Sequence, residues 1–258
     1  MRETEIVQRS SRLVPGPCQD PCVTTVRVQA GVSLLESYVR APAIGICELI
    51  WNAFDEDATQ VDVRLERQDF GGIEAVVVVD NGLGMNRERA ETGFSRVGDS
   101  WKRMDGSRSA NGRPVHGKQG RGRYAAFSIG EHVRWESVSE RVEGGLGTVT
   151  IAGRRSSLDQ FEISETVTAA SAPGTAVTIT ELSSDGLAAF DVSEALRQRV
   201  LTEFALHLDR FPDFVVNLLG TQVEPSSVID HREVVELSDA EAWSGTATLT
   251  IIEWKLEG

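Results

Sequence analysis

The segment AVVVVDNGLGM at residues 75–85 most restricts the folds open to this chain. Its valines have the apolar, β-branched character of a buried central strand. Asp80 ends that run, and Gly82 and Gly84 break it. Glycine lets a ligand approach the backbone closely, and a buried carboxylate needs hydrogen-bond donors, which an adenine amino group can supply. The segment predicts a strand that ends at a ligand site, although a strand followed by a tight Asp-Asn-Gly turn is the alternative.

A second informative segment is ELIWNAFDEDAT at residues 48–59. Positions i, i+4 and i+7 of a helix share a face, so Glu48, Asn52 and Asp55 line one stripe of a helix predicted at 43–56. A carboxylate and a carboxamide one turn apart can hold a water and a hydrated Mg²⁺ side by side. The opposite stripe predicts packing on a sheet through Ile46, Leu49, Ile50 and Ala53. An amphipathic helix with a solvated polar face is the alternative.

The third segment is GKQGRGRYAAFSIG at residues 117–130. Two glycines precede a short helix predicted at 123–129, and helix N-termini favour phosphate. Positive charge at the same point comes from Lys118, Arg121 and Arg123. The segment lacks the GxxxxGK[ST] pattern of a Walker P-loop, and a glycine-rich entry to a helix on a wet surface is the alternative. It follows a polar, glycine-rich stretch at 98–120 that predicts a long mobile loop.

Composition and charge limit the class of protein. The chain has 40% hydrophobic and 25% charged residues, which is typical of a globular protein, and three cysteines, too few for a disulfide framework. The formal net charge of −13 argues against binding DNA over the whole surface. Neither a signal peptide nor an apolar run of membrane-spanning length is visible. We therefore expect a cytoplasmic protein with no membrane partner.

The remaining pattern predicts the order of elements and the domain limits. Further helices are predicted at 33–38 and 192–211, and further strands at 61–66, 132–137, 147–152, 161–165, 175–180 and 214–218. We interpret residues 1–31 as an N-terminal arm and residues 32–222 as one domain. Beyond residue 223 the pattern restarts, which predicts the start of a second domain at 223–258 that is cut short.

Together these segments resemble the GHKL ATPases: gyrase, heat-shock chaperones, histidine kinases and MutL. ELIWNAFDEDAT resembles their N-box, DNGLGM their adenine-binding D-x-G-x-G motif, and GKQGRG the glycine-rich end of their ATP lid. PGTAVTITEL, with Gly174-Thr175, resembles a fourth motif whose threonine helps to fix the adenine. The resemblance implies the Bergerat fold, an α+β two-layer sandwich. In that fold a mixed, mostly antiparallel sheet is covered on one face by helices and a long ATP lid closes the site.

The resemblance also implies roles for individual residues. Glu48 would be the general base, and Asn52 would bind Mg²⁺. Asp80 would accept a hydrogen bond from the adenine amino group, with Thr175 assisting through water. Supporting contacts to ATP are implied for Asp55 beside the N-box, for Gly82, Gly84 and Met85 around the base, and for Lys102, Lys118, Gly120, Arg121, Gly122 and Arg123 at the phosphates.

A carboxylate at position 48 matches the branches that hydrolyse ATP, because histidine kinases carry an asparagine there. The run is most similar to MutL, but Asp55-Glu56-Asp57-Ala58-Thr59 is more acidic than the MutL pattern D-A-G-A-T, and the lid sequence also departs. We therefore expect ATP hydrolysis with lid closure and homodimerisation, and a DNA or protein client. The family's γ-phosphate contact from the next domain would fall to a residue such as Lys255. An ATP-binding switch with little hydrolysis, or a histidine-kinase catalytic domain, are the alternatives.

Overall fold

The computed structural model describes residues 23–97, 108–116, 122–141, 144–167, 172–240 and 243–255. Its helices are α1 (Val32–Glu36), α2 (Pro42–Asp55), α3 (Arg87–Ser95), α4 (Gly122–Ala125), α5 (Ser184–Asp191) and α6 (Ser193–Arg210), with 3-10 turns η2 (Ala126–Ser128), η3 (Arg155–Ser157) and η4 (Pro225–Ser227). Its strands are β1 (Thr24–Arg27), β2 (Gln60–Arg67), β3 (Ile73–Asp80), β4 (Gly130–Glu140), β5 (Leu146–Arg154), β6 (Gln160–Val167), β7 (Gly174–Leu182), β8 (Val215–Leu218), β9 (Thr221–Gln222), β10 (Ile229–Ala240) and β11 (Trp243–Trp254).

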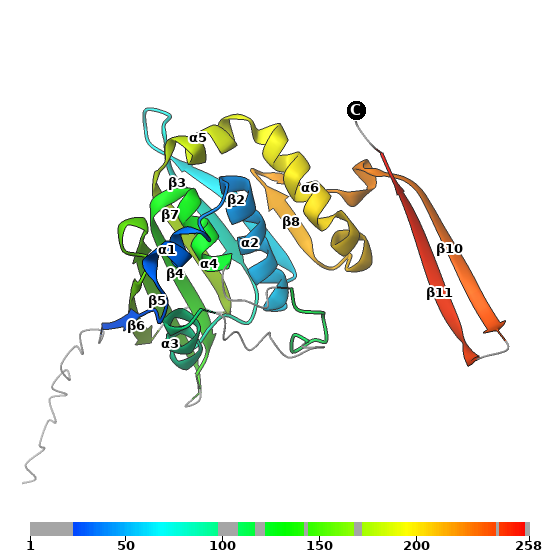
Figure 1. Ribbon diagram of the computed structural model, residues 1–258, viewed down its shortest axis with the longest axis horizontal. Helices are drawn as coiled ribbons and strands as arrows, with labels where there is room; N and C mark the ends of the chain where they lie inside the picture. The colour runs from blue at the N-terminus through cyan, green and yellow to red at the C-terminus, as the bar shows by residue number, and fades with distance from the viewer. Residues whose placement is uncertain are drawn as a thin grey trace, which may run out of the picture.

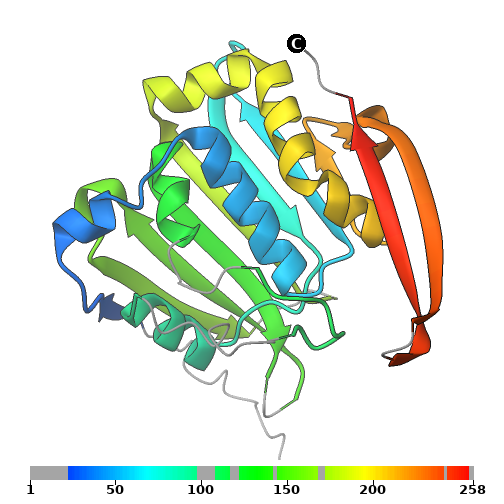
Figure 2. The ribbon, with the colours of Figure 1, turned by 45° about the vertical axis from the view of Figure 1, so that its right-hand side comes forward.

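Within these ranges, nine strands form one sheet in the order β1-β6-β5-β4-β7-β3-β2-β8-β9. Strands β2 and β8 pair in parallel, and the other neighbours in the sheet pair antiparallel. Helices α2, α4 and α6 lie over one face of this sheet (Figures 1 and 2). The structure therefore has the predicted α+β sandwich, with a mixed and mostly antiparallel sheet.

The core lies between the sheet and α2. The apolar stripe predicted on this helix is buried, with Ile46 and Ile50 fully enclosed. Three of the four valines of β3, Val76, Val77 and Val78, are buried as expected for a central strand, and Val79 is half-buried. Burying each large aliphatic side chain is worth about 1.5–3 kcal/mol. This packing holds α2 against the strands, with Glu48 and Asn52 of its polar stripe half-buried and Asp55 buried.

The strand register brings three polar residues into one row. Asp80 at the end of β3 pairs with Thr175 on β7, and Thr175 pairs with Ser137 on β4. Residues opposite each other in a sheet have their side chains close together. One edge of the central strands therefore gathers an acid and two hydroxyls from segments far apart in the chain.

Several described elements differ from the pattern predicted by sequence. Residues 24–27 of the expected arm form β1, which pairs with β6. Helix α3 was not expected, although Asn86 accepts the backbone N–H of Arg89 as an N-cap, which is a recognisable start signal. The helix predicted at 192–211 is preceded by α5, whose N-cap Ser183 accepts the N–H of Gly186.

Strands β10 and β11 form a separate two-stranded hairpin that projects from the sandwich (Figure 1). Val234 on β10 and Leu249 and Ile251 on β11 expose much of their apolar surface. An isolated hairpin is marginally stable in water. These residues thus form a unit distinct from the sheet, in the region where the sequence pattern restarts.

No helix in the described ranges is both long and apolar enough to cross a membrane.

Candidate active site

Asp80 stands at the end of β3 with one carboxylate oxygen occupied. Its Oδ1 accepts the backbone N–H of Gly82 at 2.8 Å and that of Thr175 at 3.3 Å. Burial raises the pKa of Asp80 from 3.8 to about 6; the two N–H donors act in the opposite direction, and the charge of Glu56 adds to the rise. Among the described residues no protein group donates to Oδ2. That oxygen can accept a hydrogen bond from a ligand.

The loop after Asp80 depends on its glycines for close backbone contacts. A Cβ on Gly82 would lie 2.7 Å from the carbonyl oxygen of Glu56 and 3.0 Å from Oδ1 of Asp80. Gly84 has a φ of +66°, and a Cβ there would collide with the carbonyl oxygen of Val138. The sequence predicts that these glycines make room for a nucleotide. In the structure these glycines make room for the protein's own backbone, which fixes the loop beside Asp80.

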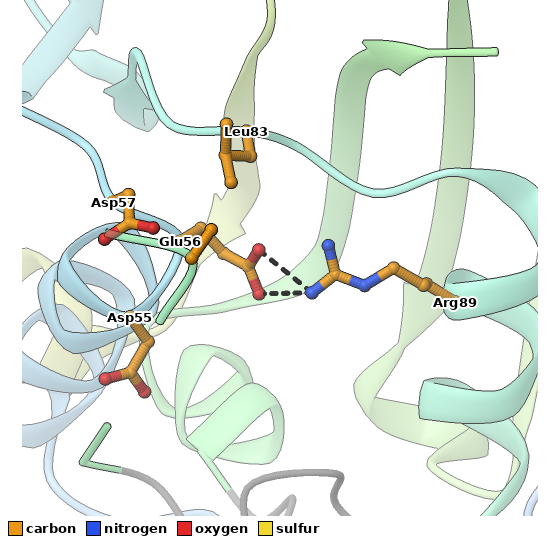
Figure 3. A pocket seen from close by; sticks show the side chains of 6 residues that line it. Asp55, Glu56, Asp57, Leu83 and Arg89 are labelled. Carbon is orange, nitrogen blue, oxygen red and sulfur yellow. Dashed lines mark hydrogen bonds and ion pairs between the residues drawn. The ribbon is translucent and has the colours of Figure 1, made fainter. Parts of the chain in front are cut away.

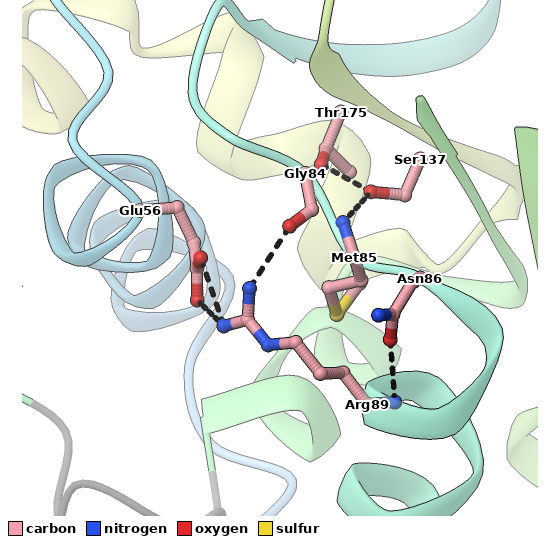
Figure 4. Close-up of polar contacts among 7 residues, drawn as sticks. All are labelled: Glu56, Gly84, Met85, Asn86, Arg89, Ser137 and Thr175. Carbon is pink, nitrogen blue, oxygen red and sulfur yellow. Dashed lines mark hydrogen bonds and ion pairs between the residues drawn. The ribbon is translucent and has the colours of Figure 1, made fainter. Parts of the chain in front are cut away.

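Ser137 is a buried residue of this site that sequence reasoning missed. Its Oγ accepts the backbone N–H of Met85 at 2.7 Å and forms a 2.8 Å hydrogen bond with Oγ1 of Thr175 (Figure 4). Its only sequence signal is a serine at an inward-facing position of an alternating strand. Ser137 links the loop after β3 to β7.

On α2, Glu48 and Asn52 lie on the half-buried polar stripe predicted for this helix. The carboxylate of Glu48 packs directly against Gly122 at the start of α4, so closely that a Cβ on Gly122 would collide with Oε2. The side chain of Asn52 makes no hydrogen bond with any described residue. The structure thus brings the predicted base to the end of the predicted lid, and it leaves an amide oxygen available one helical turn away.

Each acid of the run 55–57 has a protein partner. Oδ1 of Asp55 accepts the N–H of His116 at 2.7 Å, and Oδ2 of Asp57 accepts the N–H of Asn111 at 2.9 Å. The ring of His116 also stacks on Trp51, with centroids 3.9 Å apart. The described part of the predicted lid loop, residues 108–116, is therefore docked on the C-terminal end of α2. Asp55 matches the first position of the D-A-G-A-T pattern, and Asp57 replaces its glycine. Both acids therefore have a role in holding this loop segment.

Glu56, the third acid, pairs with Arg89 on α3. The Nη2 atom of Arg89 lies 2.7 and 2.9 Å from the two carboxylate oxygens, and Nη1 donates to the carbonyl oxygen of Gly84 at 3.1 Å. The pair lines a cavity of about 280 Å³ (Figure 3), whose walls are Asp55, Glu56, Asp57, Leu83, Arg89 and Ala110. Arg89 therefore neutralises an acid next to Asp80, and sequence alone offered no sign of this pairing.

The side chain of Arg123 contacts α3, whereas the sequence predicts that it contacts the phosphates. Its guanidinium donates to the carbonyl oxygens of Gly93 and Arg96 at the C-terminal end of α3 and lies 5.0 Å from the ring centre of Phe94. Burial lowers the pKa of this guanidinium. Unsatisfied carbonyls at a helix C-terminus attract cations, so Arg123 ties α4 to α3 instead.

The other predicted phosphate contacts, Lys102, Lys118, Gly120 and Arg121, lie outside the described residues.

Comparison with known proteins identifies the family of this chain. Residues 40–185, more than half of the chain, match the model of the histidine kinase-, DNA gyrase B- and HSP90-like ATPases. The chain belongs to this ATPase family. The matched residues include Glu48 and Asn52 of the N-box, Asp80, the lid segment at 117–122 and Thr175, so they contain all four motifs of the GHKL resemblance. The chain accordingly contains a GHKL ATPase domain, a class that binds and hydrolyses ATP.

Two relatives of this GHKL domain are similar over part of their length. A putative type II restriction enzyme, HgiDII of Herpetosiphon aurantiacus, is 39% identical over 99 residues, which is 38% of this chain and 15% of the enzyme. The DNA mismatch repair protein MutL of Ehrlichia chaffeensis is 35% identical over 73 residues, or 28% of this chain and 10% of that protein. The matched regions thus span a small part of these relatives.

Proposed function

We propose that this domain binds Mg²⁺·ATP and hydrolyses it, with Glu48 as general base and Asp80 as the adenine acceptor. The contact between Glu48 and Gly122 carries this proposal, because it joins a carboxylate to the end of the lid segment. Lid closure over the phosphates and dimerisation would complete the site. Met85 would pack beside the base, and backbone N–H groups near Gly122 would face the phosphates.

The chemistry needs a positioned base and stabilised charge. Glu48 would take a proton from water while the water oxygen bonds to the γ-phosphorus and the bond to the β,γ-bridging oxygen breaks. The products are ADP and inorganic phosphate. The proton acceptor would lie beside the lid because Glu48 packs on Gly122.

Asn52 fits the binding of magnesium. Its half-buried amide has no hydrogen-bond partner in the described part of the chain, and no group of three His, Cys, Asp or Glu side chains gathers there as a metal site. Mg²⁺ accepts one or two protein oxygens because phosphates and waters supply the rest. The bound ion would neutralise charge on the phosphates, and Asn52 would hold it beside Glu48.

The first experiment measures ATP binding and steady-state turnover against concentration of the whole chain. We expect binding, and turnover per molecule that rises with protein concentration, because a dimer would complete the site. Binding without turnover at any concentration would favour an ATP-binding switch, and absence of binding would contradict the proposal.

The two relatives are named as a restriction enzyme and a mismatch repair protein, which favours DNA as the client. If the addition of duplex DNA left the rate of ATP turnover unchanged, DNA would not be supported as the client.

ATP affinity should depend on pH through Asp80. Its pKa is about 6, and its Oδ1 is held by two N–H donors, so a proton would go to Oδ2 and oppose the adenine amino group. Affinity should therefore be full above about pH 7 and fall by about tenfold per pH unit below about pH 6. The free energy of unfolding of the protein without ATP should change in the opposite direction and fall as the pH rises through about 6. The reason is that a carboxyl group with a raised pKa in the folded state stabilises that state while it is protonated.

Calorimetric titrations of ATP between about pH 5 and pH 8 would measure this dependence. Asp80→Asn is the control, since it retains the titration of ATP itself but loses the carboxyl group. A wild-type profile parallel to that of the variant would contradict the assignment of Asp80.

A further inference from the structure

The hydroxyl of Ser137 occupies an enclosed position between two parts of the site. The side chain is inaccessible to solvent, with 0% exposure. It contacts the loop after β3 through the N–H of Met85 and contacts β7 through the hydroxyl of Thr175 (Figure 4). A serine carries one proton and two acceptor sites. The direction of each hydrogen bond can therefore be worked out.

Burial decides which hydroxyl donates. Met85 N–H is a donor, so Ser137 must accept there. If Ser137 also accepted from Thr175, its own proton would have no acceptor among the described residues, and an unsatisfied buried donor is costly. Ser137 therefore donates to Oγ1 of Thr175. The proton of Thr175, which is half-buried and has no other hydroxyl partner in the described chain, is then directed away from Ser137.

This direction determines which group of the site donates a hydrogen bond to a ligand and which group accepts one. Thr175 offers a donor beside Asp80, whose Oδ2 offers an acceptor. The two residues are paired across β3 and β7, so both face the same ligand edge. Adenine presents an amino donor next to a ring-nitrogen acceptor, which complements this order directly or through a water. Hypoxanthine presents a carbonyl acceptor next to an N–H donor, which opposes it.

We propose that Ser137 is a positioning residue that sets purine specificity by making Thr175 a hydrogen-bond donor. The inference rests on the proposed function, because it assumes that the base lies at Asp80. Without the Ser137 hydroxyl, Thr175 can rotate and act as either donor or acceptor. Discrimination between adenine and hypoxanthine should then weaken, with no change in any group that touches the base.

The test compares the affinities of ATP and inosine triphosphate (ITP) for the wild type, Ser137→Ala and Ser139→Ala. Ser139 is the matched control because it lies on the same strand and the same buried face. We expect Ser137→Ala to bind ATP about tenfold more weakly and ITP about as well as the wild type, so the ATP/ITP ratio falls. Ser139→Ala should retain the ratio. An equal loss for both nucleotides, or no loss, would overturn the inference.

A second pair of variants tests the same point without altering Ser137. Thr175→Val should lower the ATP/ITP ratio to that of Ser137→Ala, and Thr175→Ser should retain it. Adding Ser137→Ala to Thr175→Val should change the ratio no further, because Ser137 acts through the Thr175 hydroxyl. A further fall in the double variant would overturn the inference. A wild type that binds neither nucleotide would instead contradict the proposed function, so the two failures are distinguishable.

Discussion

Replacing Glu48 with alanine should reduce ATP turnover by at least about a hundredfold while leaving ATP affinity within a few-fold of the wild type. A positioned general base contributes about 10²–10⁴ to the rate, and Glu48 is the carboxylate of the N-box that packs against Gly122. Binding should persist because the proposed contacts to the base come from Asp80 on β3 and Thr175 on β7, whereas Glu48 lies on α2. Single-turnover kinetics and calorimetry would measure the two effects.

Two further variants separate chemistry from folding in this experiment. Glu48→Gln preserves the size of the side chain and should be nearly as inactive, because a carboxamide cannot accept the proton. Glu36→Ala, at an exposed position on α1, should leave turnover unchanged. If Glu48→Ala kept its turnover, the base would lie elsewhere and the proposed mechanism would be wrong.

Asp80→Asn should weaken ATP binding by about tenfold to a hundredfold, which corresponds to about 1–3 kcal/mol for a buried hydrogen bond replaced by an unpaired group. The structure indicates why the amide cannot adapt. The N–H groups of Gly82 and Thr175 require an acceptor at the Oδ1 position, so the amide oxygen would stay there. The NH₂ group would then occupy the Oδ2 position and meet the adenine amino group as a second donor.

The same titration of Asp69→Asn provides the control, since Asp69 lies in an exposed turn between β2 and β3. Its ATP affinity should match that of the wild type. An unchanged affinity in Asp80→Asn would show that adenine does not meet this carboxylate, and it would also remove the basis for the role of Ser137.

The polar stripe of α2 and the strand before Asp80 could be predicted from sequence because both depend on local periodicity. Helical spacing places Glu48, Asn52 and Asp55 on one face whatever the rest of the chain does. A run of valines before an acid and two glycines similarly predicts a buried strand that stops at a turn. The motifs carried by these elements were enough to predict the family and the fold.

Contacts between distant segments were not predictable in this way. The Ser137–Thr175 hydrogen bond depends on the register of β4 against β7, and a shift of one residue would turn Ser137 to the other face of the sheet. The Glu56–Arg89 pair similarly depends on how α2 and α3 pack. From its sequence, Arg123 was expected to contact phosphate as one of several basic residues in a glycine-rich segment. The nearby carbonyls of α3 hold its guanidinium instead.

The sequence by itself determined the GHKL motifs, the faces of the elements that carry them and the class of fold, because these follow from covalent order and short-range periodicity. Only the tertiary structure decided the partners of the acids at 55–57, the location of Arg123 and the hydrogen bond between Ser137 and Thr175. Those features depend on burial and strand register, which set the distance between groups that are far apart in the chain and the cost of leaving them unpaired.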